Sequence, residues 1–260
     1  MNATLTHAWV LTQRELLHWS RQPMMPVFNL AFSMMLLLMF GLLFGGAMDV
    51  PGGADYVSFL VPGMLTVTMM FGIQGTMISM AADAKRGITD RFRSLPIGGS
   101  AVALGRSGAD MITSVVELAV LVGGGLLIGW RVDAGPGPVL LALLLLLWLR
   151  YSLIWLGVFL GLTFRTEGAS TAIQVLVWPV AFASNAFVAP ETMPAWLQPV
   201  ADWNPISATA TATRELFGNA TGITASWQVD ASMWLAIAWP LVITLVFLPL
   251  SARAYRRLRH

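Results

Sequence analysis

The sequence predicts an all-α polytopic membrane protein with six transmembrane helices, preceded by a helix that lies along the membrane surface. Of its 260 residues, 57% are hydrophobic and 11% are charged, whereas a soluble chain is about 45–50% apolar and about 25% charged. The apolar residues gather in six stretches with few or no charges, and about 20 such residues are enough to cross a hydrocarbon core of about 30 Å. Little sequence is left for a water-soluble domain.

The chain accordingly divides into an amphipathic helix over 1–22 and a membrane domain over 23–260. The predicted spans are 26–48, 57–82, 101–130, 138–163, 170–190 and 231–252. With these spans, twelve Lys and Arg residues lie on the side of both termini, and only Arg131 and Arg214 lie on the other. The positive-inside rule therefore predicts that both termini are cytoplasmic.

Residues 1–22 predict an interfacial helix, because a helical wheel separates apolar from basic side chains, as a helix in the membrane plane requires. The apolar face holds Leu5, Ala8, Trp9, Leu16 and Trp19, and the opposite face holds Arg14, His18 and Arg21. The alternative is a plain cytoplasmic extension of the first span.

The outer segment between the fifth and sixth spans contains several prolines together with Trp196 and Trp203. Aromatic rings favour the headgroup level, so the segment predicts short helices on or in the outer leaflet. The alternative is an ordinary surface loop.

The residue types do not indicate a catalytic or metal-binding site. The chain has no cysteine and three histidines, all near the termini, so neither a thiolate site nor a histidine-based metal or nucleophile site is expected inside the membrane. The single lysine, Lys85, follows Ala84 and not the glycine of a phosphate-binding loop. We expect no enzyme activity, no metal and no nucleic-acid partner, and if ATP is used, another chain binds it.

Asp110, Glu117 and Arg150 lie well inside predicted spans, where burial in lipid costs several kcal/mol and marks a functional hypothesis. Glu117 and Arg150 each lie about twelve residues from the outer end of their span, at matching depth. The sequence therefore predicts a Glu117–Arg150 ion pair that fixes helix register, with a proton or substrate relay as the alternative. Asp110 either pairs with Arg106 at i,i+4 spacing or faces cytoplasmic water.

The loop between spans two and three carries the most specific motif. Basic residues alternate there with apolar ones up to Pro96, which predicts a short amphipathic helix that docks on a partner. The pattern D-x-x-x-G-I-x-D-R-F-R-S-L-P-I over 83–97 follows L-V-P-G at 60–63. Further on come A-F-A-S-N-A-F-V-A-P-E-T-M-P-A-W-L over 181–197, W-N-P-I at 203–206 and R-E-L at 214–216. Together these resemble ABC-2 type permease subunits of the daunorubicin-resistance class, although Asn185 stands where that family more often has Gly.

The resemblance implies a type V exporter-like fold, in which the loop is the coupling helix and residues 3–21 form the connecting helix. The implied coupling residues are Asp83, Arg86, Gly87, Asp90, Arg91, Phe92, Arg93, Leu95 and Pro96. Spans one, two and five would face a central cavity, with 190–217 as a re-entrant gate above it. Candidate substrate-path residues on these spans are Asn29, Phe32, Met35, Met64, Phe71, Gln74, Phe182 and Asn185.

The resemblance further implies a subunit of an ATP-driven exporter of hydrophobic drugs, natural products or lipids in a bacterial cell membrane. Its partners would be two copies of an ATP-binding subunit that carry ATP and Mg, a second permease, identical or closely related, and membrane lipid. The alternative is a secondary transporter or channel without an ATPase partner, which would need intramembrane relays and usually inverted repeats.

Overall fold

The computed structural model describes residues 3–21, 24–46, 50, 55–85, 99–164, 166–219 and 227–257. All the regular elements in these ranges are helices, which confirms the predicted fold class. Their bounds are α1 Ala3–Arg21, α2 Met24–Phe44, α3 Tyr56–Lys85, α5 Gly99–Leu127, α6 Pro136–Thr163, α7 Glu167–Phe182, η1 Pro190–Thr192, α8 Gln198–Asp202, α9 Pro205–Phe217, α10 Trp227–Asp230 and α11 Ser232–Arg257.

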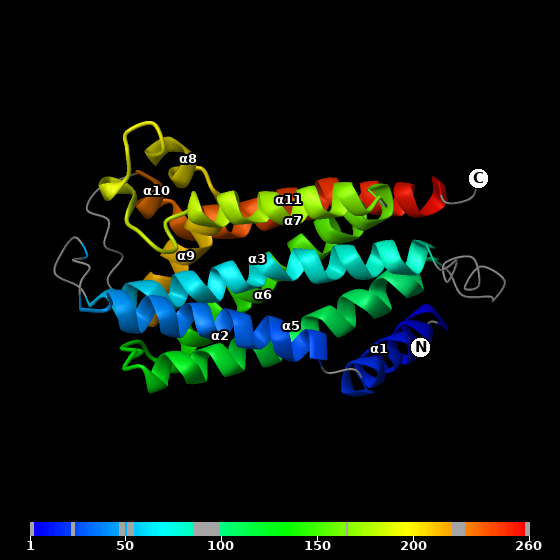
Figure 1. Ribbon diagram of the computed structural model, residues 1–260, viewed down its shortest axis with the longest axis horizontal. Helices are drawn as coiled ribbons and strands as arrows, with labels where there is room; N and C mark the ends of the chain where they lie inside the picture. The colour runs from blue at the N-terminus through cyan, green and yellow to red at the C-terminus, as the bar shows by residue number, and fades with distance from the viewer. Residues whose placement is uncertain are drawn as a thin grey trace.

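Five of these helices are long and apolar enough to cross a membrane: α2, α3, α5, α6 and α11. The shorter apolar helix α7 occupies the place of the predicted fifth span, but it has 16 residues and extends about 24 Å at 1.5 Å per residue. The predicted span 170–190 is therefore too long at its outer end, where the chain turns after Phe182 instead of continuing as a helix. The long helices run side by side, and α1 lies at the same end as the C-terminal end of α11 (Figure 1).

Helix α3 is the central element, since 83% of its apolar window is buried inside the protein, against 17–50% for the other long helices. Its packing against α6 depends on two glycines spaced four residues apart. A Cβ at Gly157 would lie 3.0 Å from Thr76, and one at Gly161 would lie 2.9 Å from Met80. Glycines spaced in this way let two membrane helices approach closely, and the contact fixes α6 beside the C-terminal half of α3.

Helix α1 packs on α5 at the end of the bundle where α3 ends and α5 begins (Figure 1). Leu11 and Thr12 are buried in this contact, whereas Trp9 of the predicted apolar face is 56% exposed. Because one side of α1 faces α5 and the other is open, apolar residues occur on both, and the placement of its apolar face in the membrane surface stays a prediction.

The outer segment forms the predicted short helices, η1, α8, α9 and α10, at the end of the bundle opposite to α1 (Figure 1). Helix α9 is not a surface helix, since nearly all its residues are buried. Asn204 caps it by accepting a hydrogen bond from the Ile206 amide at 3.0 Å and donates to the Val180 carbonyl at 2.8 Å. The same side chain thus starts α9 and satisfies a carbonyl left open where α7 ends.

Candidate functional site

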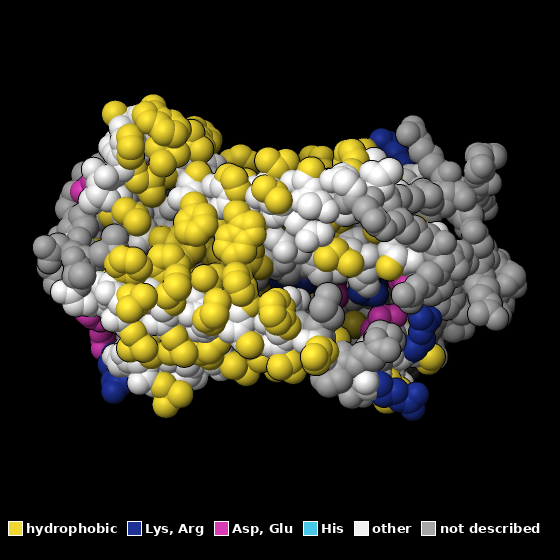
Figure 2. Space-filling view, in the orientation of Figure 1, with side chains coloured by type: hydrophobic (Ala, Val, Ile, Leu, Met, Phe, Trp, Pro, Cys, Tyr) yellow, Lys and Arg dark blue, Asp and Glu magenta, His cyan; other side chains and the backbone are white. Residues whose placement is uncertain are grey.

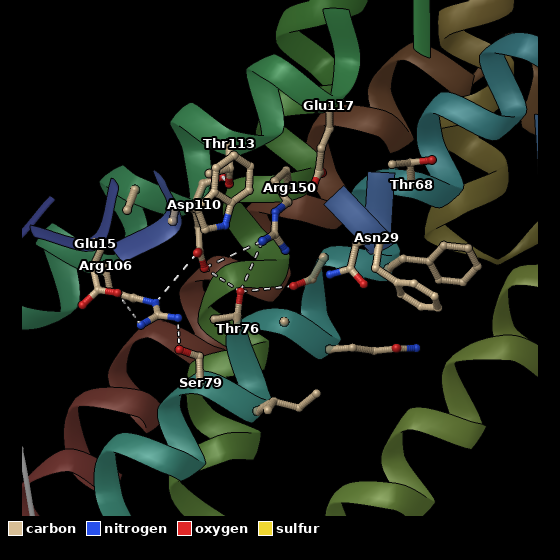
Figure 3. Close-up of a pocket in the computed structure, with 18 of the residues that line it drawn as sticks. Glu15, Asn29, Thr68, Thr76, Ser79, Arg106, Asp110, Thr113, Glu117 and Arg150 are labelled. Carbon is tan, nitrogen blue, oxygen red and sulfur yellow. Dashed lines mark hydrogen bonds and ion pairs between the residues drawn. The ribbon is translucent and has the colours of Figure 1, made fainter. Parts of the chain in front are cut away.

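A cavity of about 1110 Å³ lies between α1, α2, α3, α5, α6 and α7, in the half of the molecule that carries α1 (Figure 3). Hydrophobic side chains spread over the surface of the middle of the molecule, and acidic and basic side chains surround a hollow near the α1 end (Figure 2). The cavity lining combines aromatic rings with charged groups. Such a mixture suits a ligand with a large apolar body and a polar group.

The aromatic part of the lining comes from α2, α3 and α7. The Phe32 ring meets Trp178 edge-on with centroids 5.6 Å apart, and the Phe71 ring lies 4.7 Å from Trp178. Gln74 beside them donates to the Gln174 carbonyl at 3.4 Å, which ties α3 to α7. These contacts position a continuous aromatic surface on one side of the cavity.

The charged part of the lining centres on Arg106 of α5 (Figure 3). Its Nη1 lies 3.1 Å from the Glu15 carboxylate of α1 and 3.7 Å from Asp83 in the last turn of α3, and its Nε lies 3.8 Å from Asp110. Nη2 donates to the Ser79 hydroxyl. Arg106 therefore joins α1 to both helices that flank the loop 86–98.

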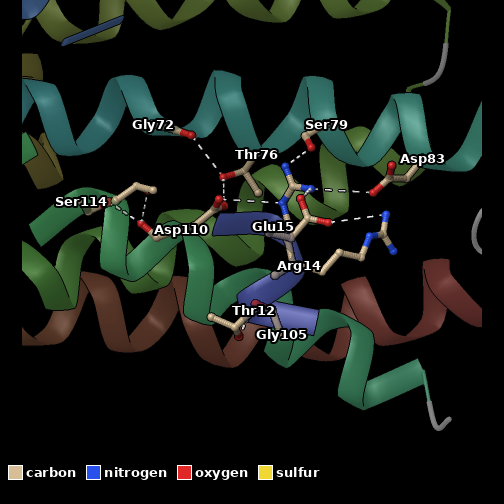
Figure 4. A network of polar contacts seen from close by, with 12 residues as sticks. Thr12, Arg14, Glu15, Gly72, Thr76, Ser79, Asp83, Gly105, Asp110 and Ser114 are labelled. Carbon is tan, nitrogen blue, oxygen red and sulfur yellow. Dashed lines mark hydrogen bonds and ion pairs between the residues drawn. The ribbon is translucent and has the colours of Figure 1, made fainter. Parts of the chain in front are cut away.

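A second contact fixes α1 to the same place. The Thr12 hydroxyl donates to the Gly105 carbonyl at 2.8 Å (Figure 4). A Cβ at Gly108 would lie 2.9 Å from the Thr12 oxygen, so glycine there allows the two helices to touch. Both contacts of α1, with Arg106 and with Gly105, involve the first part of α5, directly after the loop 86–98.

The polar contacts continue from Asp110 towards the middle of the membrane helices. Asp110 accepts a hydrogen bond from the Thr76 hydroxyl at 2.6 Å and lies 3.7 Å from Nη2 of Arg150 on α6. Arg150 also donates to Thr76 at 3.2 Å and to the Ser114 hydroxyl at 3.0 Å. Four side chains from α3, α5 and α6 thus form one polar network in the low-dielectric interior, in which Nη1 of Arg150 is buried and has no hydrogen-bond partner among the described residues.

Gly72 of α3 makes room for this arrangement. A side chain at position 72 would overlap the guanidinium of Arg150, which is 4% exposed and lies directly against the α3 backbone. The arginine can be buried here only because α3 has no Cβ at that point.

The predicted Glu117–Arg150 pair is not a direct contact in the structure, although Arg150 attracts the Glu117 carboxylate from a longer distance. Both residues are described, and the carboxylate within 4 Å of Arg150 is that of Asp110. The prediction compared backbone depths only, whereas a long basic side chain inside a membrane extends towards the nearer water. The guanidinium accordingly points to Asp110, Thr76 and Ser114. The i,i+4 pairing of Asp110 with Arg106 is the alternative that the structure contains.

The eight candidate substrate-path residues separate into two groups. Asn29, Phe32, Phe71 and Gln74 line the cavity. The other four lie elsewhere: Met64 is 1% exposed in the core, Met35 is 52% exposed on the outside of α2, Phe182 is exposed and stacks on Phe187, and Asn185 is buried in the outer layer. They do not line the cavity because it lies on the α1 side of the bundle, whereas Met64, Phe182 and Asn185 lie nearer the outer end.

Of the nine candidate coupling residues, the structure describes Asp83, which pairs with Arg106. The other eight, Arg86, Gly87, Asp90, Arg91, Phe92, Arg93, Leu95 and Pro96, lie outside the described residues.

Arg214 is the main residue whose environment sequence reasoning missed. Its side chain is fully buried, donates to the carbonyls of Phe59 at 2.8 Å and Asn185 at 2.9 Å, and stacks 3.7 Å over the Phe59 ring. Burial lowers the pKa of its guanidinium to about 9, so the group stays charged at neutral pH. The turn after α7 is therefore fixed to α3 and α9 by one cation. In the sequence, Arg214 stands beside Glu215 in the outer segment, and nothing in that context predicts that its side chain is buried.

The helices and the cavity define a multi-pass membrane protein with a polar-lined cavity at one end. The chain belongs to the ABC-2 type transporter family, whose model matches residues 6–217. It is 37% identical over 259 residues to the daunorubicin resistance ABC transporter permease protein DrrB1 of Streptomyces coeruleorubidus, covering 98% of this chain and 87% of that protein. It is also 24% identical over 245 residues to the putative transport permease ycf38 of Cyanophora paradoxa, covering 92% and 84%.

Proposed function

We propose that this chain is the permease subunit of an ATP-driven exporter that moves a hydrophobic drug, natural product or lipid out of a bacterial cell. ATP and Mg would bind to a separate ATP-binding subunit, of which two copies dock on the cytoplasmic side of a pair of permeases. Both termini would be cytoplasmic, and the charged end of the cavity would face the cytoplasm. Membership of the ABC-2 family and the drug-resistance permease among its relatives support this function.

The observation that carries the proposal is the set of contacts around Arg106. The loop 86–98 leaves from the end of α3 and returns at the start of α5, and Arg106 holds both flanks together through Asp83 and Ser79. Asp110 then connects Arg106 to Arg150 on α6. A displacement of the loop by a partner would therefore pull on groups that line the cavity, which is what coupling between ATP hydrolysis and transport needs.

The cavity would provide the substrate-binding site. A substrate would enter from the cytoplasmic side or the inner leaflet and lie against the aromatic surface of Phe32, Phe71 and Trp178. The outer layer of α8 and α9, fixed by Arg214, closes the opposite end. Release would require that layer to separate from α3.

The test is reconstitution of the full-length chain in proteoliposomes, alone and with its co-expressed ATP-binding subunit. The permease alone should hydrolyse no ATP, and the complex should export a fluorescent hydrophobic drug only with ATP and Mg. Arg91→Ala and Phe92→Ala should reduce export while leaving the complex assembled and hydrolysing ATP. Lys85→Ala, at the end of α3, serves as the matched control on the edge of the same loop.

Two results would contradict the proposal. ATP-independent transport driven by a proton gradient, with no partner chain, would favour a secondary transporter. Full ATP-coupled export by both loop variants would show that the loop 86–98 does not couple the two subunits.

A further inference from the structure

Helix α1 carries a row of basic and apolar side chains on the side opposite to its contact with α5. Val10, Arg14, Leu17 and Arg21 share one face of the helix, because residues four and seven positions apart lie above one another. Val10 and Leu17 are 56% and 57% exposed, and both arginines are exposed as well. Thr12, which contacts α5, lies on the other side of the helix. We call these four residues the basic face.

The chain compensates the charge of the basic face only in part. Glu15 is the only acidic residue of α1, and its carboxylate lies 3.1 Å from Nη1 of Arg106 and 3.8 Å from Nη2 of Arg14. Arg106 therefore shares this carboxylate, and the side chain of Arg14 stays 50% exposed. Arg21 makes no ion pair within 4 Å among the residues that the structure describes. Helix α2, which follows, contains no charged residue.

An exposed apolar surface lies beside these guanidinium groups, at the start of α2. Met24, Val27 and Phe28 are 83%, 58% and 65% exposed. Met24 and Phe28 border the cavity together with Arg14 and Arg21, so the basic and the apolar surfaces meet at its mouth. Basic side chains accordingly stand beside apolar ones at this end of the molecule (Figure 2).

A phospholipid with a negatively charged headgroup fits both surfaces. Its phosphate accepts hydrogen bonds from guanidinium groups, which match phosphate geometry. Basic residues on an amphipathic helix at a membrane surface attract anionic lipids, and the acyl chains would cover the apolar start of α2. An acidic protein surface would match the arginines but not the apolar side chains beside them.

We propose that the basic face of α1 and the start of α2 form a binding site for an acidic phospholipid at the mouth of the cavity. The headgroup lies against Arg14 and Arg21, and the acyl chains lie along Met24, Val27 and Phe28. This site requires α1 to lie at a membrane surface, but it does not depend on the export function or on what the cavity holds.

The test compares phosphatidylglycerol with phosphatidylcholine, which differ in headgroup charge, with the same acyl chains and the same fluorescent label. Their affinities for the full-length chain in detergent are measured by fluorescence anisotropy. The wild type should bind phosphatidylglycerol more tightly. Arg21→Gln should lower the ratio of the two affinities about fivefold, which corresponds to about 1 kcal/mol per basic residue near an anionic lipid surface.

Three further variants sharpen the comparison. Arg14→Gln should lower the ratio less than Arg21→Gln, because Glu15 already lies beside Arg14. Arg21→Lys should keep most of the preference, since it keeps the charge. Arg131→Gln, the same change at an exposed position beyond the far end of α5, should leave the ratio unaltered.

An unchanged ratio in the double variant Arg14→Gln/Arg21→Gln would overturn the inference. Both side chains are exposed, so this variant should melt like the wild type. A preference of the wild type that persists at an ionic strength of about 1 M, where the Debye length is about 3 Å, would also overturn it. Loss of the co-expressed ATP-binding subunit from the double variant, with an unchanged lipid ratio, would assign the basic face to a protein partner instead. The binding assay contains no ATP-binding subunit, so its result is independent of whether the chain exports.

Discussion

Asp110→Asn and Glu117→Gln form the sharpest test of the structure, because the two acids lie on the same helix and each neutralisation removes one carboxylate. Asp110 pairs with Arg150 at 3.7 Å, with side chains 16% and 5% exposed. Breaking a buried ion pair by removing one partner costs about 3–5 kcal/mol. We expect the lower end, about 3 kcal/mol, since the pair is at the long end of ion-pair distances and Asp110 borders the cavity. In the part of the chain that the structure describes, Glu117 has no ion pair within 4 Å and is only attracted by Arg150 from farther away, so Glu117→Gln should leave stability unchanged or raised.

The assay is thermal unfolding of both purified variants in the same detergent, followed by circular dichroism. For a chain of this size 1 kcal/mol corresponds to about 2–4 °C, so Asp110→Asn should melt roughly 6–12 °C below the wild type. The reasoning would be refuted by the reverse order, with Asp110→Asn like the wild type and Glu117→Gln destabilised. That order would mean that Arg150 pairs with Glu117, as backbone depth alone suggests.

Three further predictions concern the surroundings of this network. Gly72→Ala should lower the free energy of unfolding by about 1–3 kcal/mol, because the new Cβ overlaps the buried guanidinium of Arg150. Gly75→Ala has open space around it and should be neutral or slightly stabilising in the same melting assay. In the reconstituted complex, Arg106→Gln should reduce export about tenfold more than ATP hydrolysis; equal losses would argue against a role in coupling. Arg214→Met leaves several backbone carbonyls without a donor and should lower the free energy of unfolding by about 3–5 kcal/mol. Arg131→Met, at an exposed position, should change it by less than about 0.5 kcal/mol. Similar melting temperatures for these two variants would contradict the burial of the Arg214 side chain.

The membrane helices could be predicted because lipid imposes a long uncharged run, and that signal is local. The predicted spans 57–82 and 138–163 agree with α3 and α6 within a few residues at each end. The span 170–190 failed at its outer end because what stops α7 is not local. Asn204 and Arg214, more than 20 residues further on, supply the hydrogen bonds that let the chain turn there.

The candidate site could be predicted only in part, for a similar reason. A span shows which residues are polar but not how far an arginine side chain extends, so Arg150 was placed against the wrong carboxylate. The role of Glu15 gives no signal in the sequence, since its contact with Arg106 joins positions 91 residues apart. Asn29 and Gln74 stand out in the sequence because an uncharged polar residue is rare in an apolar span, and both line the cavity, while their place on a substrate path stays a prediction.

The glycines between α3 and α6 bear on how the protein can move. At Gly157 and Gly161 the α6 backbone touches α3 so closely that sliding by one helical turn would bring a larger side chain, Leu153, to the place of Gly157, where only hydrogen fits. Packed interfaces of this kind resist continuous deformation. Helices α3 and α6 therefore form one rigid unit. The rearrangement in transport must fall on their neighbours, and α2, only 22% of whose apolar window is buried, is the least restrained of the long helices beside the cavity.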